Sequence, residues 1–211
     1  MKTLITILLT AASMVGMGQK IFTEGVVEYK IDILKGAENA TVASAFGGAT
    51  QTLYIKSYRA RLDFKSNLRN QSTVYDAQDK EGFILKQNGA EKYLLPLEDG
   101  NWQKYHQRYA GASFTKLTET KQIAGYTCLK AVGKMKDGAE VVVFYCPDLK
   151  PLAAGYDPLF EALGGLPLEY QLGSNGVLLS YTAQSVQATM VATGMFELPK
   201  TGYKVLEFAQ Q

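Results

Sequence analysis

The chain has 211 residues, and its 22 Lys and Arg nearly balance 20 Asp and Glu, for a formal net charge of +2. Basic residues are spread along the sequence among acidic ones, which argues against a nucleic-acid partner. Thirteen Tyr and nine Phe accompany one Trp, a mixture that favours strands, and no stretch beyond the N-terminus is apolar over the roughly 20 residues that a transmembrane helix needs.

The first eighteen residues have the three parts of a secretory signal peptide. Lys2 is their only charge, an apolar run follows from Leu4 to Val15, and Gly16-Met17-Gly18 supplies small residues for a peptidase. We expect cleavage after Gly18, although a buried N-terminal helix is the alternative. No Cys lies near this site to accept a lipid anchor. The prediction is therefore a signal peptide at 1–18 and one exported domain at 19–211, soluble in the periplasm or secreted.

Alternating apolar and polar residues predict the first strands. Residues 27–33 alternate, as expected for a strand with one buried face, whereas the Ala-rich stretch 37–48 fits either a short helix or a loop. Residues 52–64 read as one long strand that places Tyr54, Tyr58, Leu62 and Phe64 on the same face, together with Ala60. Residues 83–97 then predict a hairpin that turns at Asn88-Gly89 and pairs Lys86 with Glu91.

The only two cysteines lie in a predicted hairpin around Lys136-Asp137-Gly138. Its register places Cys128 opposite Cys146 and also pairs Lys134 with Glu140, a favourable pair of opposite charges. In an oxidising compartment this predicts a structural disulfide. A redox couple is disfavoured by the wide spacing, and a zinc site by a chain with one His and two Cys. We expect no metal and no cofactor.

A short helix and another hairpin follow. Asp157 at the N-cap, Pro158 at the first helical position and Gly164 after the last turn mark the helix, whose apolar side would present Leu159, Phe160 and Leu163. The hairpin turns at Asn175-Gly176, and its register pairs Leu172 with Leu179 and Tyr170 with Tyr181 on one half-buried face.

Catalytic motifs are missing from the sequence. There is no phosphate-binding glycine loop, no Gly-x-Ser-x-Gly and no His-Glu-x-x-His. His106 is the only histidine and is expected to be an ordinary strand or loop residue. Arg59 and Arg61 could bind an anion, but a solvated strand face is the simpler interpretation. We therefore expect a protein that is not an enzyme.

Five segments together resemble a domain family of unknown function from Bacteroidetes cell-envelope proteins, which is related in shape to the lipoprotein-localisation-factor (LolA-like) superfamily. The resemblance covers about residues 24–206. The segments that carry it are TLYIKSYRARLDF, STVYDAQDKEGF, TETKQIAGYTCLKA, LGGLPLEY and MFELPKTGYK. It implies a mainly β fold with minor α: a strongly curved antiparallel sheet, or incomplete barrel, with one to three short helices over its concave side. Relatives of this shape hold lipid or acyl chains in an apolar cleft.

Together these inferences predict that the protein is non-catalytic and binds an apolar ligand, such as a lipid or a lipoprotein acyl chain. The expected cleft residues come from the long strand and from the helix that would cover it: Tyr54, Tyr58, Leu62, Phe64, Leu159, Phe160 and Leu163. A filled core in place of a cleft is an open alternative. The other function to consider is a cell-envelope protein-protein interaction module without a small ligand.

Overall fold

The computed structural model describes residues 20–208 except residues 99 and 110. The predicted signal peptide at 1–18 lies outside this range. Within it, no helix is both long and apolar enough to span a bilayer.

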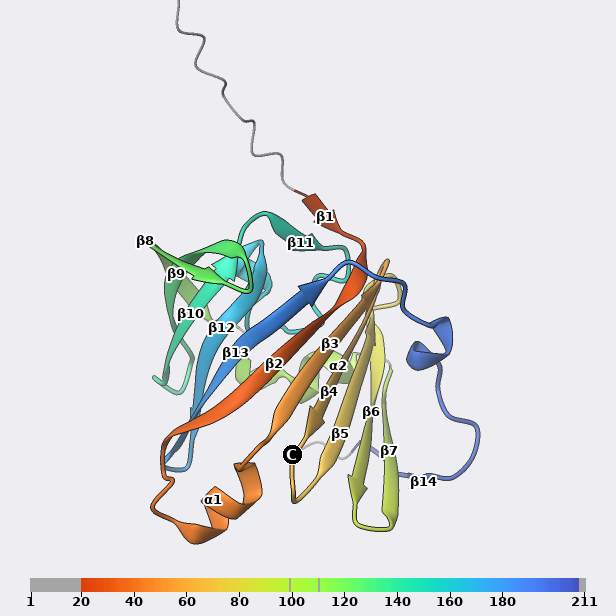
Figure 1. The fold of residues 1–211 in the computed structure, drawn as a ribbon. Coiled ribbons are helices and arrows are strands. Elements are labelled where there is room, and N and C mark those ends of the chain that lie inside the picture. The colour runs from red at the N-terminus through yellow and green to blue at the C-terminus, as the bar shows by residue number, and fades with distance from the viewer. Residues whose placement is uncertain (1–19, 99, 110, 209–211) are drawn as a thin grey trace, which may run out of the picture.

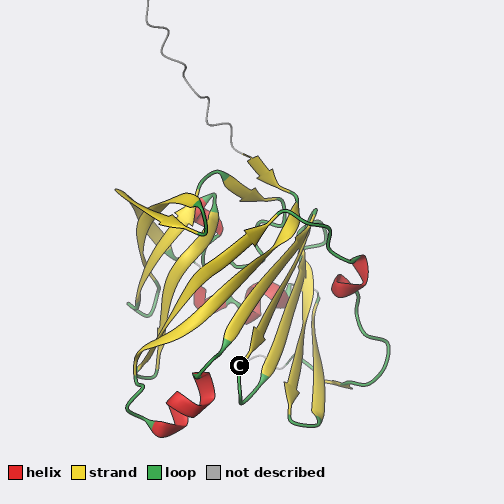
Figure 2. Cartoon of the chain, in the orientation of Figure 1, coloured by secondary structure: helices red, strands yellow, loops and turns green. Residues whose placement is uncertain are grey.

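Strands dominate the fold, as the sequence predicts (Figures 1 and 2). In the described residues, twelve strands form one sheet in the order β14-β7-β6-β5-β4-β3-β2-β13-β12-β10-β9-β8. The first six along the chain are β2 (Glu24–Lys35), β3 (Thr50–Lys56), β4 (Arg59–Lys65), β5 (Asn70–Asp76), β6 (Glu81–Asn88) and β7 (Glu91–Leu97). The other six are β8 (Ser113–Ile123), β9 (Tyr126–Lys134), β10 (Glu140–Cys146), β12 (Leu166–Ser174), β13 (Val177–Gln187) and β14 (Lys204–Val205). A separate parallel pair joins β1 (Lys20–Phe22) to β11 (Leu149–Pro151).

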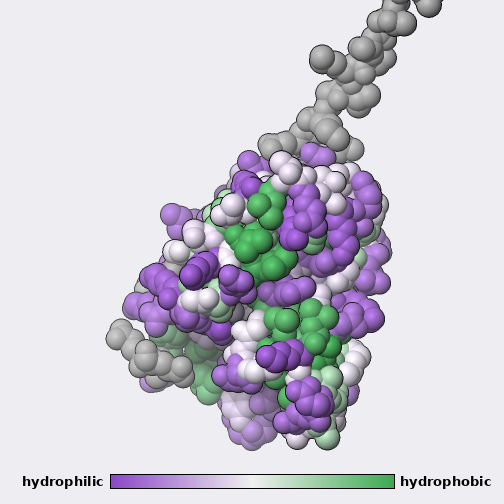
Figure 3. Space-filling view, turned by 90° about the vertical axis from the view of Figure 1, so that its left-hand side faces the viewer, coloured by the Kyte–Doolittle hydropathy of each residue, from purple (hydrophilic) through white to green (hydrophobic). Residues whose placement is uncertain are grey.

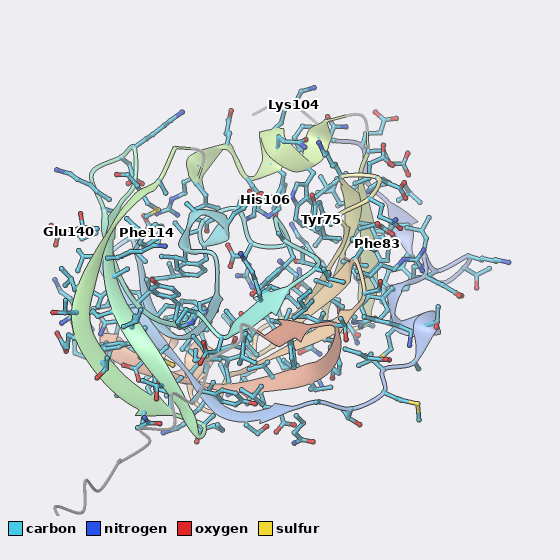
Figure 4. All side chains as sticks on the ribbon, turned by 90° about the horizontal axis from the view of Figure 1, so that it is seen from above. Tyr75, Phe83, Lys104, His106, Phe114 and Glu140 are labelled. Atoms are coloured by element: carbon cyan, nitrogen blue, oxygen red, sulfur yellow. The ribbon has the colours of Figure 1, made fainter. Side chains whose placement is uncertain are left out.

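The large sheet bends around its own interior without closing. Viewed from above, its ribbon curves around the central segment, which is the stretch 147–165 between β10 and β12 (Figure 4). Neighbouring strands are antiparallel except β14 and β7, which are parallel, so the sheet is mixed rather than purely antiparallel. β8 and β14 form its two edges. The mainly β prediction is thus confirmed, with an open sheet and one parallel edge strand.

The helices are short. They are α1 (Ala40–Phe46) and α2 (Asn101–Tyr105), with 3-10 turns η1 (Gln107–Tyr109), η2 (Glu161–Leu163) and η3 (Thr193–Phe196). The open question at 37–48 is answered by α1, because the Asn39 side chain accepts hydrogen bonds from the amides of Thr41 and Val42 and so caps the helix. The predicted helix at 157–163 does not form in full. Asp157 accepts a hydrogen bond from Leu159 N, as a helix cap would, but only the 3-10 turn η2 follows.

The prediction of one strand at 52–64 is wrong. The chain reverses at Ser57-Tyr58, and Ser57 adopts a φ of 54°. Lys56 then pairs with Arg59, and Leu53 pairs with Leu62. The reversal carries no Gly, Asn or Pro, so the usual turn signals were absent. It also places Tyr54 on the opposite face of the sheet from Leu62.

The other hairpins match the predictions more closely. Asn175 and Gly176 both have positive φ, and the predicted pairs Leu172–Leu179 and Tyr170–Tyr181 are present. The hairpin at 83–97 turns one residue later than predicted, because Asn88 remains in β6 and Gly89 takes the positive φ. Lys86 therefore pairs with Tyr93 instead of Glu91.

The cysteine hairpin has the predicted register but not the predicted disulfide. Lys134 pairs with Glu140 and Val132 with Val142, yet Cys128 and Cys146 are buried free thiols. The pairing of β9 with β10 ends at Leu129 and Tyr145, one residue short of the cysteines. The Cys128 thiol points instead to the carbonyl of Tyr126, at 3.7 Å.

Free thiols in this position should be unreactive while the protein is folded. Burial raises the pKa of Cys128 to about 12 and also raises the pKa of Cys146, so little of the reactive thiolate forms near neutral pH. We expect Ellman's reagent at pH 8 to modify both thiols in denaturant and to modify the folded protein far more slowly. If the denatured, unreduced protein releases no thiol and weighs two hydrogens less than the reduced chain, the cysteines form the disulfide after all.

Candidate functional site

The concave side of the sheet is filled at one end and hollow at the other. The filled end is occupied by the segment between β10 and β12, which contributes the buried Leu149, Ala153, Phe160 and Leu163 to the main core. β11 of this segment lies at the end of the molecule opposite α1 (Figure 1). The sequence left open whether the interior is hollow or filled. In the structure one end of the interior is filled and the other end is hollow.

The hollow part is a cavity of about 1350 Å³. Ligand pockets usually have volumes of about 300–1,000 Å³, so this one is large enough for a lipid-sized molecule. Its wall takes residues from β3 to β7, β12 and β13, from the α2–η1 segment, and from the end of the described chain. The apolar and aromatic part of the wall comprises Phe46, Leu62, Phe64, Leu95, Tyr105, Tyr109, Met135, Tyr156, Leu159, Tyr170, Leu172, Val177, Leu179, Tyr181, Leu206 and Phe208.

Strand register arranges the β3–β7 side of this wall in two rows. The outer row, next to α1, runs across β3 to β6 through Gln51, Phe64, Gln71 and Lys86. The inner row lies two residues away on each strand, farther from α1, and runs through Leu53, Leu62, Thr73, Ile84 and Leu95; of these, Leu62, Thr73 and Leu95 line the cavity. Two residues along a strand span about 7 Å. The wall therefore changes from largely polar to largely apolar over about 7 Å of depth.

A helix and its flanking turn cross the open side of the curved sheet. α2 and η1 link β7 to β8, and Figure 4 shows His106 on the inner side of this segment and Lys104 on its outer side. Trp102 anchors α2: it is 2% exposed, stacks on Tyr75 at 4.4 Å between ring centroids, and donates a hydrogen bond to the Gly155 carbonyl at 3.3 Å. These contacts hold α2 against both the sheet and the central segment.

Tyrosines surround the carboxyl group of Asp157, in the part of the segment between β10 and β12 that forms the roof of the cavity. Asp157 accepts a hydrogen bond from Leu159 N at 3.2 Å, and burial raises its pKa to about 6. Tyr170 stacks on Tyr181 at 4.7 Å, and its hydroxyl accepts a hydrogen bond from Gln51 Nε2 at 2.6 Å. The roof is thus polar enough to orient a ligand, although the Asp157 carboxylate and the Tyr170 hydroxyl each already take part in a hydrogen bond within the protein.

His106, Asp157 and Ser174 all line this cavity, and such residues could form a catalytic set. However, His106 Nδ1 lies 2.9 Å from the carbonyl of Trp102, and burial lowers the pKa of its imidazole. Asp157 is bonded to a backbone amide. Across the described ranges, no hydrogen bond joins any two of the three side chains.

The seven predicted cleft residues fall into three groups. Leu62, Phe64 and Leu159 line the cavity. Phe160 and Leu163 are buried in the filled end. Tyr54 packs on the convex face beside Val74 and Phe83, and Tyr58 is 42% exposed in the β3–β4 turn, because the chain reverses at Ser57-Tyr58. Of the helix expected to cover the cleft, Asp157 and Leu159 line the cavity.

The cavity also contains residues that sequence reasoning missed. Gln51 and Lys86 had no motif to mark them, and Asp157 was identified only as a helix N-cap. The stacked Tyr170 and Tyr181 could have been found from the correctly predicted hairpin. Arg59 and Arg61 lie outside the cavity wall and are paired with Asp76 and Asp63, so the anion site considered for them is not formed.

Comparison with known proteins relates the chain to others by fold alone. No family model and no curated protein matches it. Two structures of PNGF-II are similar: the C2 form has 16% identity and a TM-score of 0.53, and the P21 form has 18% and 0.52. Each match covers 88% of this chain, which spans about a third of the PNGF-II chain. An uncharacterized conserved protein from Thermus thermophilus has 14% identity and a TM-score of 0.51, with 88% of this chain and 91% of that one covered. The resemblance to the Bacteroidetes and LolA-like families stays a prediction.

Proposed function

We propose that the protein is an exported, non-catalytic binding protein that holds an apolar ligand, such as a lipid or a lipoprotein acyl chain, inside its curved sheet. The cavity of about 1350 Å³ carries this proposal, because its inner wall is apolar and aromatic and its volume suits a long chain. The proposal also includes periplasmic or secreted localisation without a lipid anchor, and kinship with the LolA-like superfamily.

A cavity-filling substitution should block uptake. Leu172 and Leu178 are both half-buried leucines of the β12–β13 hairpin, but only Leu172 lines the cavity. We expect Leu172→Trp to weaken binding of a neutral acyl-chain fluorophore about tenfold, which corresponds to ~1.4 kcal/mol. Leu178→Trp should bind as the unaltered protein does. Fluorescence titration of both variants measures the difference.

Native ligand content gives an independent test. The protein is purified without detergent, extracted with organic solvent, and the extract is analysed by lipid mass spectrometry. A stoichiometric lipid in the unaltered protein that is depleted in Leu172→Trp supports the proposal. Clean extracts together with no fluorophore uptake would overturn it.

A protein-interaction module is the second candidate, and one edge strand favours it. β8 is exposed along almost its whole length and, among the described strands, pairs on one side only, with β9. Unpaired strand edges can accept a strand from another chain. Apolar residues on the flank that includes β8 to β10 gather in separate patches among hydrophilic ones, so a partner would have to use the edge rather than a broad apolar face (Figure 3). Cross-linking that recovers one stoichiometric partner through β8 would favour this function.

A further inference from the structure

Cationic side chains gather around the cavity. Four line it, and they come from four different parts of the chain: Arg69 from the β4–β5 turn, Lys86 from β6, Lys104 from α2 and Arg108 from η1. The carboxylates in the wall are Asp157 in the roof and Glu207 near the end of the described chain. The wall therefore carries more positive than negative charge, although the chain as a whole is nearly neutral.

Three of these cations have no carboxylate partner. Arg108 lies 3.4 Å from Asp137, but no ion pair in the described part of the chain involves Arg69, Lys86 or Lys104. Lys86 is half-buried on the concave face, and its ammonium group has no hydrogen-bond partner among the residues that the structure describes. Lys86 therefore buries part of its stem in the cavity wall while its ammonium group has no counter-charge among the described residues. A ligand that brings an anion would supply what is missing.

The cations also lie at a defined depth. Lys86 is in the outer row of the wall, and the Arg69 guanidinium carbon lies 5.6 Å from the ring centroid of Phe64 in the same row. The inner row, with Leu62 and Leu95, lies about 7 Å deeper. A molecule with its chain on the inner row would present its terminal group to Lys86 and Arg69.

We propose, building on the binding function above, that the ligand is an anionic amphiphile whose apolar chain lies along the inner wall. Its carboxylate or phosphate group lies in the outer row, where Lys86 and Arg69 bind it and Lys104 and Arg108 contribute to the positive field. Arg presents a planar pair of donors to such oxyanions, and Lys presents a point charge. Neutral lipids of the same chain length would bind more weakly.

The test uses the protein without residues 1–18, loaded with N-phenyl-1-naphthylamine, a neutral apolar dye. Palmitate and palmitoyl lysophosphatidic acid are compared with hexadecanol as competitors at pH 8 and low salt. We expect both anionic competitors to displace the dye at about tenfold lower concentration than hexadecanol, as a charge-assisted hydrogen bond would give. Raising the salt to about 0.5 M should narrow the difference.

Two substitutions assign the effect to Lys86. Lys86→Met, which keeps the apolar stem and removes the charge, should reduce the preference for anions to about twofold, whereas Lys86→Arg should retain it. Lys92→Met is the matched control, because Lys92 lies on the adjacent strand β7 outside the cavity wall. It should leave the preference unchanged.

The outcomes separate this inference from the function on which it rests. If the dye binds and hexadecanol competes as well as palmitate, the anionic class is wrong and the binding function stands. If neither dye nor any competitor binds, the binding function itself fails. Calorimetry with inorganic phosphate distinguishes a free anion from an anionic lipid headgroup. If phosphate binds as tightly as lysophosphatidic acid, the site binds free anions, and the proposal of an amphiphilic ligand is overturned.

Discussion

Replacing Trp102 with Ala should lower the free energy of unfolding by about 3–5 kcal/mol, the range for large aromatic residues removed from a core. Trp102 is 2% exposed and connects α2 to the sheet through Tyr75 and to the central segment through Gly155. Gly82 lies beneath it, and a Cβ there would come within 2.9 Å of the indole ring. The indole therefore lies directly on the sheet, and its loss leaves a void that the rigid strands cannot fill.

Urea denaturation followed by far-ultraviolet circular dichroism measures this loss, since the variant has no Trp fluorescence. Tyr105→Ala is the control: Tyr105 lies on the same helix, but its side chain is 37% exposed, so we expect a change below about 1 kcal/mol. Equal effects from the two substitutions would show that α2 is not anchored through Trp102.

Replacing Asp157 with Asn should stabilise the protein by up to about 3 kcal/mol at pH 7. Burial raises the pKa of the Asp157 carboxyl from 3.8 to about 6, and each pKa unit corresponds to ~1.4 kcal/mol. Because the folded protein holds this proton more tightly than the unfolded chain, folding stability falls as pH rises from about 4 to about 6. Asn keeps an oxygen that can accept the hydrogen bond from Leu159 N, but it carries no charge.

The difference between Asp157→Asn and the unaltered protein should therefore be full above about pH 6 and vanish below about pH 4. Urea midpoints at pH 4, 5, 6 and 7 measure it. Asp79→Asn, in the exposed β5–β6 turn, should give no pH-dependent gain. A stabilisation by Asp157→Asn that is constant from pH 4 to pH 7 would contradict the proposed cause.

Local patterns predicted much of the fold. The alternation at 27–33, the Asn175-Gly176 turn and the register of the cysteine hairpin each depend on neighbouring residues, and each is confirmed. The reversal at Ser57-Tyr58 was missed because no glycine, asparagine or proline marks it; the Ser57 amide donates a hydrogen bond to the Thr23 carbonyl, a contact that the local sequence does not reveal. α2 was missed because its five residues are too few to show helical periodicity.

The candidate site was harder to predict than the strands around it. Three of the seven expected residues line the cavity, and two of them, Leu62 and Phe64, do so because this depends only on which face a strand presents. Tyr54 and Tyr58 lie elsewhere because of the reversal at Ser57-Tyr58. The places of Leu159, Phe160 and Leu163 depend on how far the segment between β10 and β12 enters the curved sheet, and no local pattern reports that distance. The gathering of Arg69, Lys86, Lys104 and Arg108 likewise results from the sheet's curvature.

The pairing of β2 with β13 has a consequence for how the chain folds. It joins residues about 150 positions apart, such as Ile31 and Tyr181, whereas β2 to β7 and β8 to β10 pair mainly with neighbours in sequence. Each run of strands can form early from local contacts, but the seam between the runs must wait for a large loop to close. During synthesis or export, the N-terminal half of the sheet would stay open at β2 until β13 arrives. The unpaired backbone edge of β2 and its apolar face would need protection from aggregation over that interval.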